Sequence, residues 1–261
     1  MHAFQYLLPS SAAEAVKAAG IGDARFIAGG QSLLGAMKLG LAAPELLIDL
    51  AALSGLRGIT REGDEIVIGA MSTHASVAAS AEVAAIPALA QLADGIGDRQ
   101  VRHRGTLGGS LANNDPAACY PAAVLGLGAT VVTDRRRIAA DDFFKGLYET
   151  ALAPGELITA VRFPVPRRAG WEKFKQPASR FALVGVFVSQ GAAGVRVAVT
   201  GAGPGVMRIP ALEAALSQQW SAAACEGITV LPDGLNSDLH GSAEYRAALI
   251  PVLTARAVAG C

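Results

Sequence analysis

Apolar and polar positions in the first 50 residues follow helical and extended periods in turn. Leu33, Leu34 and Met37 recur at helical spacing, and Gly40 follows them as a C-cap. The run LLIDL is apolar at most positions and is typical of a buried strand. The pattern predicts helix, strand, helix and strand, at residues 10–19, 25–28, 32–39 and 46–50.

A second block begins near Leu53 and carries a hairpin pattern around Gly63-Asp64, with strands at 58–60 and 65–69. Helices are expected at 72–80 and 86–92, a glycine-rich loop at 105–114 and a strand at 129–133. Asp115 followed by Pro116 is typical of a helix start, with Asp at the N-cap and Pro at N1. We therefore expect a helix from there to about Leu127.

The remaining chain places strands before helices. After a strand at 157–163 comes a basic stretch bounded by proline, 164–168, where we place a domain boundary. Three strands and two helices follow, at 171–175, 181–189, 195–200, 211–220 and 243–259, the last helix interrupted by Pro251. Strands followed by helices favour an α+β module.

Composition narrows the possible functions. The chain has 261 residues, 22 Lys plus Arg and 22 Asp plus Glu, so its net charge is zero, without the basic field that nucleic acid or an anionic membrane attracts. The three cysteines, Cys119, Cys225 and Cys261, form no CxxC, which argues against disulfides, iron–sulfur clusters or structural zinc in this chain. Neither a signal peptide nor a membrane span is expected, so we predict a soluble cytoplasmic protein.

Two loops with paired glycines are the candidates for chemistry. They are AGGQSL at 28–33 and RGTLGGSLANNDP at 104–116; neither GxGxxG nor Walker A is present. Glycine lets backbone N–H groups approach an anion closely, and Ser32, Thr106 and Ser110 add hydroxyl donors. Two such loops can hold the two phosphates of a pyrophosphate, although each pair alone can also be an ordinary tight turn. The Arg135–Arg137 run is interpreted as a solvated turn.

These motifs, together with the continuation of the second one through DPAACYPAAVLGLGA, resemble the FAD-binding medium subunit of molybdenum hydroxylases, a PCMH-type family that includes carbon monoxide dehydrogenase and bacterial xanthine dehydrogenase. The resemblance extends over nearly the whole chain, through PGELI, FKQ and GSAEYR. It implies a two-subdomain α/β FAD-binding domain at 1–165 (subdomains about 1–53 and 54–165). A smaller α+β C-terminal domain is implied at 166–261, which makes the chain α+β overall.

By resemblance, Lys175 reaches the flavin ring, where a cation stabilises the charge of the reduced ring. Phe181 packs near the ring or in the core, and Asp115 contacts the cofactor or only caps its helix. Because the first loop carries no histidine that could tether the ring, we expect non-covalent FAD. The implied cofactor-binding residues are Ala28, Gly29, Gly30, Gln31, Ser32, Leu33, Ile96, Thr106, Leu107, Gly108, Gly109, Ser110, Asp115, Ile158, Lys175 and Phe181.

One position departs from the family pattern. Cys119 stands where relatives often carry a cofactor-bonding Asp, and a thiol is a weak hydrogen-bonding group. Either this contact is lost, or Asp115 or Asn114 replaces it. We expect no metal site and no catalytic residue in this chain.

The resemblance implies an oxidoreductase of three parts. A large subunit with molybdopterin oxidises the substrate, a small subunit with two [2Fe–2S] clusters relays electrons, and this chain collects them on FAD and passes them to an external acceptor. A dimer of such heterotrimers is expected. The alternatives are a self-contained flavin-dependent oxidoreductase and a non-catalytic scaffold of the same fold. Neither the substrate nor the acceptor can be inferred from this chain.

Overall fold

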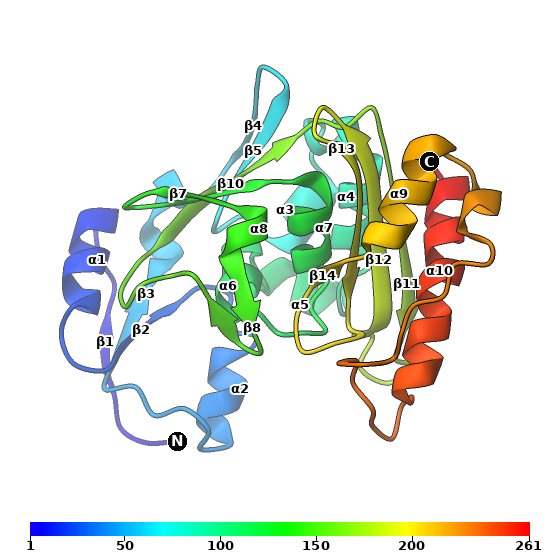
Figure 1. Cartoon of the computed structure of the whole chain (residues 1–261). Coiled ribbons are helices and arrows are strands. Elements are labelled where there is room, and N and C mark those ends of the chain that lie inside the picture. The colour runs from blue at the N-terminus through cyan, green and yellow to red at the C-terminus, as the bar shows by residue number, and fades with distance from the viewer.

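The computed structural model describes residues 1–261 and has mixed α and β structure. Three main sheets lie side by side across the molecule, and the chain forms them in order from the N-terminus to the C-terminus (Figure 1). The elements change sheet between Leu56 and Ile59 and again between Pro164 and Arg168. No helix combines the length and apolar character needed to cross a bilayer.

The N-terminal part is a three-stranded parallel sheet in the order β1-β3-β2. Its helix α1 is capped by the Ser11 side chain, which accepts from the backbone N–H of Glu14. The elements are β1 (Gln5–Leu7), α1 (Ala12–Ala19), β2 (Ala24–Ile27), α2 (Leu33–Lys38), β3 (Leu46–Asp49) and two 3₁₀ turns, η1 (Leu50–Ala52) and η2 (Ser54–Leu56). The helices and strands predicted for this part are confirmed.

The central part is a five-stranded antiparallel sheet in the order β4-β5-β10-β6-β7, with helices packed on it. Its strands are β4 (Ile59–Glu62), β5 (Glu65–Gly69), β6 (Thr130–Thr133), β7 (Arg137–Ala139) and β10 (Ile158–Pro164), with a separate hairpin of β8 (Phe144–Gly146) and β9 (Glu149–Thr150). The helices are α3 (His74–Ala78), η3 (Val83–Ala85), α4 (Pro87–Asp94), α5 (Arg99–Arg104), α6 (Leu107–Asn113), α7 (Tyr120–Leu127) and α8 (Ala140–Phe143).

The C-terminal part is a four-stranded antiparallel sheet in the order β11-β12-β13-β14, one strand more than predicted. Helices α9 and α10 cover one face, and α7 of the central part packs on β12 and β13. The elements are β11 (Arg168–Lys175), β12 (Ala182–Gly191), β13 (Gly194–Thr200), β14 (Met207–Arg208), α9 (Pro210–Gln218), η4 (Ala222–Cys225) and α10 (Ala243–Ala259).

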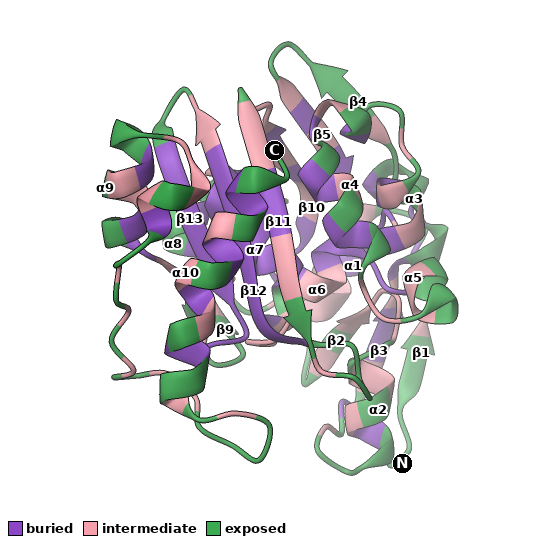
Figure 2. Ribbon diagram, turned by 90° about the vertical axis from the view of Figure 1, so that its right-hand side faces the viewer, coloured by how far each residue is buried: buried purple, intermediate pink, exposed green.

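Strand β12 is buried on both faces (Figure 2). Val184, Val186 and Val188 belong to the core beneath α9 and α10. Phe187 belongs instead to the core of the central part. The second and third parts therefore share a core, and the domain boundary near residue 165 remains a prediction.

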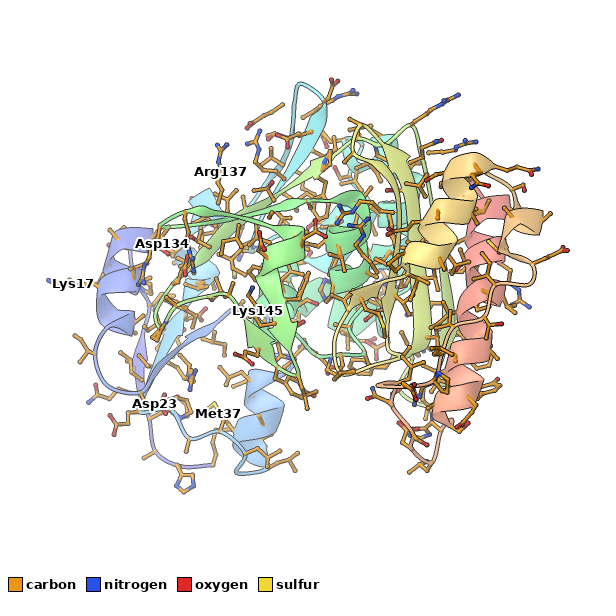
Figure 3. The ribbon with its side chains drawn as sticks, viewed as in Figure 1. Lys17, Asp23, Met37, Asp134, Arg137 and Lys145 are labelled. Carbon is orange, nitrogen blue, oxygen red and sulfur yellow. The ribbon has the colours of Figure 1, made fainter.

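Two sequence expectations need adjustment outside the site. Helix α10 is continuous through Pro251, rather than interrupted by it. Proline removes only one backbone donor, and buried residues on both sides, among them Ile250 and Leu253, hold the helix against the sheet. The basic run is exposed as expected, and Arg137, labelled in Figure 3, points outward; Arg136, however, forms an ion pair with Glu156.

Candidate functional site

A cavity of about 1140 Å³ lies where the three parts meet. Its walls include both glycine loops, the segment before Ile158 and the loop between β11 and β12. Small-molecule sites commonly measure about 300–1,000 Å³, so this cavity is large enough for a long ligand such as a dinucleotide. Because each part contributes a wall, a ligand bound here contacts all three.

The first glycine loop presents unpaired backbone donors to the cavity. The amides of Gly29, Gly30, Gln31 and Ser32 form no hydrogen bond within the protein. Gly30 has φ +74°, a conformation that favours glycine, and Ser32 makes no side-chain cap on α2. Successive free N–H groups of this kind form an anion-binding nest. This is the donor set that a pyrophosphate requires.

The two glycine loops touch each other. A Cβ at Gly29 would overlap the carbonyl of Arg104, and one at Gly109 would lie 3.6 Å from the Cβ of Ala28. At Gly108, an added Cβ would lie 2.6 Å from that of Ala70. The glycines therefore serve two purposes: some permit this close packing, and Gly30 permits the turn that opens the nest.

The second loop is not a loop throughout, which corrects the prediction for residues 105–114. Leu107–Asn113 form helix α6, capped by Thr106, whose hydroxyl accepts from the backbone N–H of Gly109. Leu107 and Leu111, four residues apart, are fully buried, and this packing outweighs the low helix propensity of two glycines. Tertiary contacts of these two leucines therefore determine that the segment is helical.

The backbone donors of this second segment are already in use. Leu107 N–H donates to Ser72, Gly108 N–H to Ala70 and Ser110 N–H to Thr106. The Ser110 hydroxyl remains free and the residue lines the cavity. The symmetric picture of two loops with equivalent free amides is therefore wrong; the first loop holds the nest.

Asp115 lines the cavity but does not begin the following helix. Its carboxylate accepts from the N–H of Ala117 at 2.8 Å, which closes a local turn, and α7 begins only at Tyr120. The predicted helix start, with Asp115 at the N-cap and Pro116 at N1, therefore lies four residues too early. The N-cap position of α7 is Cys119.

A lysine lines the cavity, but it is Lys173 rather than Lys175. The Lys173 ammonium donates to the carbonyls of Gly95 at 2.6 Å and Arg180 at 3.2 Å, and lies 3.5 Å from the sulfur of Cys119. Lys175 is exposed at the end of β11, where the pairing with β12 shifts register, and it does not line the cavity.

The loop between β11 and β12 carries two further lining residues. Arg180 has φ +61° and donates to the carbonyl of Gly97 at 3.2 Å. Phe181 is 49% exposed and lines the cavity, which excludes the alternative of a core position. Together with Ile96 on the opposite segment, these residues give this end of the cavity an apolar and cationic character.

Most of the predicted cofactor residues are thus brought together. Leu107 is buried in the core and Lys175 lies outside, and neither lines the cavity. The predicted residues that do line it are Ala28, Gly29, Gly30, Gln31, Ser32, Leu33, Ile96, Thr106, Gly108, Gly109, Ser110, Asp115, Ile158 and Phe181.

His74 is a lining residue that the sequence gave no reason to select. It is 5% exposed, and burial together with the charge of Arg102 lowers its pKa to about 4. Its Nδ1 atom has no hydrogen-bond partner within the protein. At neutral pH it therefore adds an uncharged polar group to the wall near Gly105. Only the packing of α3 against the second loop reveals it.

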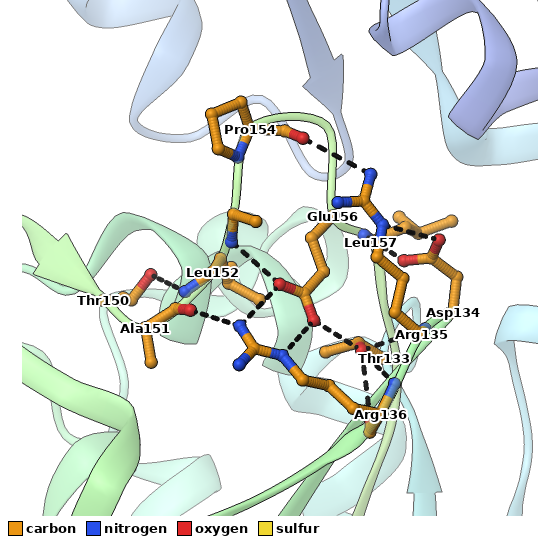
Figure 4. Close-up of polar contacts among 11 residues, drawn as sticks. Thr133, Asp134, Arg135, Arg136, Thr150, Ala151, Leu152, Pro154, Glu156 and Leu157 are labelled. Atoms are coloured by element: carbon orange, nitrogen blue, oxygen red, sulfur yellow. Dashed lines mark hydrogen bonds and ion pairs between the residues drawn. The ribbon is translucent and has the colours of Figure 1, made fainter.

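Glu156 fixes the cavity wall that precedes Ile158 (Figure 4). Its carboxylate accepts from both Nε and Nη2 of Arg136 at 2.9 Å, from the Thr133 hydroxyl at 2.8 Å and from the N–H of Ala153 at 2.8 Å. The Arg136 guanidinium, with these neutral donors, lowers the pKa of Glu156 to about 2.

We expect Glu156→Gln to destabilise the protein by about 1–3 kcal/mol at pH 7, because charge-assisted hydrogen bonds are lost in a buried position. Since the folded-state pKa is lowered from 4.5 to about 2, the contribution of Glu156 is complete above pH 4.5 and declines as the pH falls toward 2. Urea unfolding at pH 7 and at pH 3 measures it. An equal loss at both pH values would contradict the ion-pair assignment.

Known proteins are similar to this chain over most of its length. Residues 2–166 match the model of the FAD binding domain in molybdopterin dehydrogenase. The nicotine 6-hydroxylase medium subunit of Paenarthrobacter nicotinovorans is 40% identical over 90% of this chain and 89% of its own length. The carbon monoxide dehydrogenase medium chain of Hydrogenophaga pseudoflava is 36% identical over 98% of this chain and 96% of its own.

Solved structures match at similar extent. A structure of carbon monoxide dehydrogenase from Hydrogenophaga pseudoflava superposes with a TM-score of 0.88, at 36% identity, over 99% of this chain and 96% of that one. Quinoline 2-oxidoreductase from Pseudomonas putida 86 gives a TM-score of 0.89 at 31% identity, over 99% and 96%. The predicted α+β fold class and the recognised family are confirmed.

Proposed function

The chain belongs to the family of FAD-binding domains of molybdopterin dehydrogenases, and we propose that it is the FAD-carrying electron-transfer subunit of a heterotrimeric molybdenum hydroxylase. The observation that carries this proposal is the cavity with four unpaired backbone amides at one loop. The named relatives are subunits of larger enzymes, which favours this function over a self-contained flavin oxidoreductase or a scaffold.

In this proposal FAD is bound by the two glycine segments and by residues of the C-terminal part. Amides of Gly29 to Ser32 would donate to the pyrophosphate, and the hydroxyl of Ser110 would add a donor from the second segment. Ile96 and Phe181 would pack against the flavin ring. We assign to Lys173 the role expected of Lys175, because its ammonium lies at the wall.

FAD, when bound, would accept single electrons from one-electron carriers and deliver two electrons to an acceptor. The protein's part is to bind it, to orient it and to balance its charge. A preorganised cation at the wall stabilises negative charge without the reorganisation that water would need. The residues of this chain bind no substrate of the complex in this proposal.

Its partners would be a large molybdopterin-binding subunit and a small subunit with two [2Fe–2S] clusters, assembled as a dimer of heterotrimers in the cytoplasm. This chain offers no cluster of His, Cys, Asp and Glu placed to hold a metal ion. The relatives' names, medium subunit and medium chain, support such a division of labour.

We expect the purified complex to contain one FAD per copy of this chain, released entirely by acid precipitation. No histidine lies in the first glycine loop to tether the ring, so the flavin stays in the supernatant. Chromatography of that supernatant distinguishes FAD from FMN, and gel electrophoresis of the same preparation reports the two partners. Flavin in the precipitate, or a complex without flavin, would contradict the proposal.

A further inference from the structure

The Lys173 ammonium has no anionic partner. Its three polar contacts are two backbone carbonyls, of Gly95 and Arg180, and the sulfur of Cys119. Gly95 is the C-cap of α4, so its carbonyl carries only the partial negative charge of a helix end. A half-buried cation thus lines the cavity without a compensating carboxylate.

None of the acidic residues of the cavity contacts the Lys173 ammonium. Glu156 pairs with Arg136, and Asp23 pairs with Arg25. The Asp115 carboxylate accepts from the N–H of Ala117 and acts on Cys119 through space. Among the contacts of the Lys173 ammonium, Cys119 is the one side chain. The identity of residue 119 therefore decides whether this cation is neutralised, since backbone carbonyls cannot be exchanged by substitution.

Cys119 is present as the neutral thiol. It is 6% exposed, and burial raises its pKa above the ordinary value, although the Lys173 charge opposes this. A neutral thiol contacts the ammonium but leaves its charge in place. An Asp at the same position would bring a carboxylate to the ammonium and form a salt bridge.

We propose that Cys119 is a positioning residue that leaves the Lys173 charge uncompensated and thereby raises the reduction potential of flavin bound in the cavity. The inference rests on the proposed function. Reduction of the oxidised ring by two electrons from an iron–sulfur donor, with uptake of one proton, makes the ring more negative by one charge. An uncompensated cation at the wall stabilises the reduced ring more than the oxidised ring.

The test compares matched variants of the purified complex. Cys119→Asp and Cys119→Asn have the same shape and differ in charge. We expect Asp to shift the equilibrium toward oxidised flavin at least about ten-fold, equivalent to about 30 mV for a two-electron couple. Asn changes it less than about two-fold. Spectroelectrochemical titration at the flavin bands measures the potential, and thermal unfolding verifies that each variant is folded.

Lys173 variants provide the second arm. We expect Lys173→Met to lower the flavin potential, as Cys119→Asp does. Lys173→Arg keeps the wild-type potential, because the charge of the side chain rather than its packing is responsible. If Cys119→Asp does not fold, the two Lys173 variants decide whether the uncompensated cation raises the flavin potential. Equal potentials for Asp and Asn, or a Lys173→Met protein with the wild-type potential, would overturn the inference. A wild-type complex without FAD would instead refute the proposed function.

Discussion

Gly30→Val weakens FAD binding by at least about a hundred-fold. Gly30 holds φ +74°, and its neighbouring amides are free to bind an anion. A branched side chain cannot adopt this conformation without strain, so the nest distorts and the cofactor loses its donors. Two hydrogen bonds to a charged group contribute roughly 3–6 kcal/mol together, and 1.4 kcal/mol is ten-fold in affinity. Fluorescence titration of the apo-protein with FAD measures the effect.

Gly227→Val is the matched control. Gly227 has φ +75°, nearly that of Gly30, with open space around the position of a Cβ, and it does not line the cavity. Both substitutions therefore impose similar backbone strain, and only one touches the site. If the two variants bind FAD equally, Gly30 has no role in phosphate binding.

Gly126→Val lowers the melting temperature through the interface between the central and C-terminal parts. A Cβ at Gly126 would lie 2.9 Å from Cδ1 of Phe187 and 3.3 Å from its carbonyl oxygen, and the Ser189 hydroxyl donates to the Gly126 carbonyl at 2.7 Å. Overpacking a core costs about 1–3 kcal/mol, and three added carbons belong at the upper end. We expect a decrease of roughly 6–12 °C by differential scanning calorimetry.

Gly35→Val controls for the helical context. Gly35 also lies within a helix, α2, but no atom lies within 4 Å of an added Cβ. Valine has a slightly better helix propensity than glycine, so this variant melts at or slightly above the wild-type temperature. A similar melting temperature for both variants would show that α7 does not depend on close contact with β12.

The residues that line the cavity come from three parts of the chain. The two glycine segments belong to the N-terminal and central parts, whereas Lys173 lies on β11 of the C-terminal part and Arg180 and Phe181 lie in the loop that follows it. The packing of α7 on β12 fixes these groups relative to one another. Substitutions in the first glycine loop can therefore alter binding, while substitutions at Lys173 or at Cys119 of the central part can alter the charge balance.

Local signals in the sequence were sufficient for much of the fold. The strands at β3, β5, β6, β10 and β12 were predicted because each carries an apolar run bounded by turn residues, a signal contained within a few positions. The first glycine loop was identified on the same basis. Its Gly-Gly pair allows a positive φ, which Gly30 adopts, but the second Gly-Gly pair lies in a helix with its amides in use, so the pair alone did not show which loop has free donors.

Contacts between distant segments decided the rest. The sequence predicted a loop at Leu107–Asn113, but the burial of Leu107 and Leu111 stabilises a helix there. The family resemblance selected Lys175, but the packing of β11 against α4 places Lys173 at the cavity wall. The sequence by itself determined the family, the α+β class and most of the long strands, and it identified both glycine segments as candidates, because these depend on neighbouring residues. Only the tertiary structure decided which lysine faces the cavity and that its charge has no partner, because both depend on how separate elements pack.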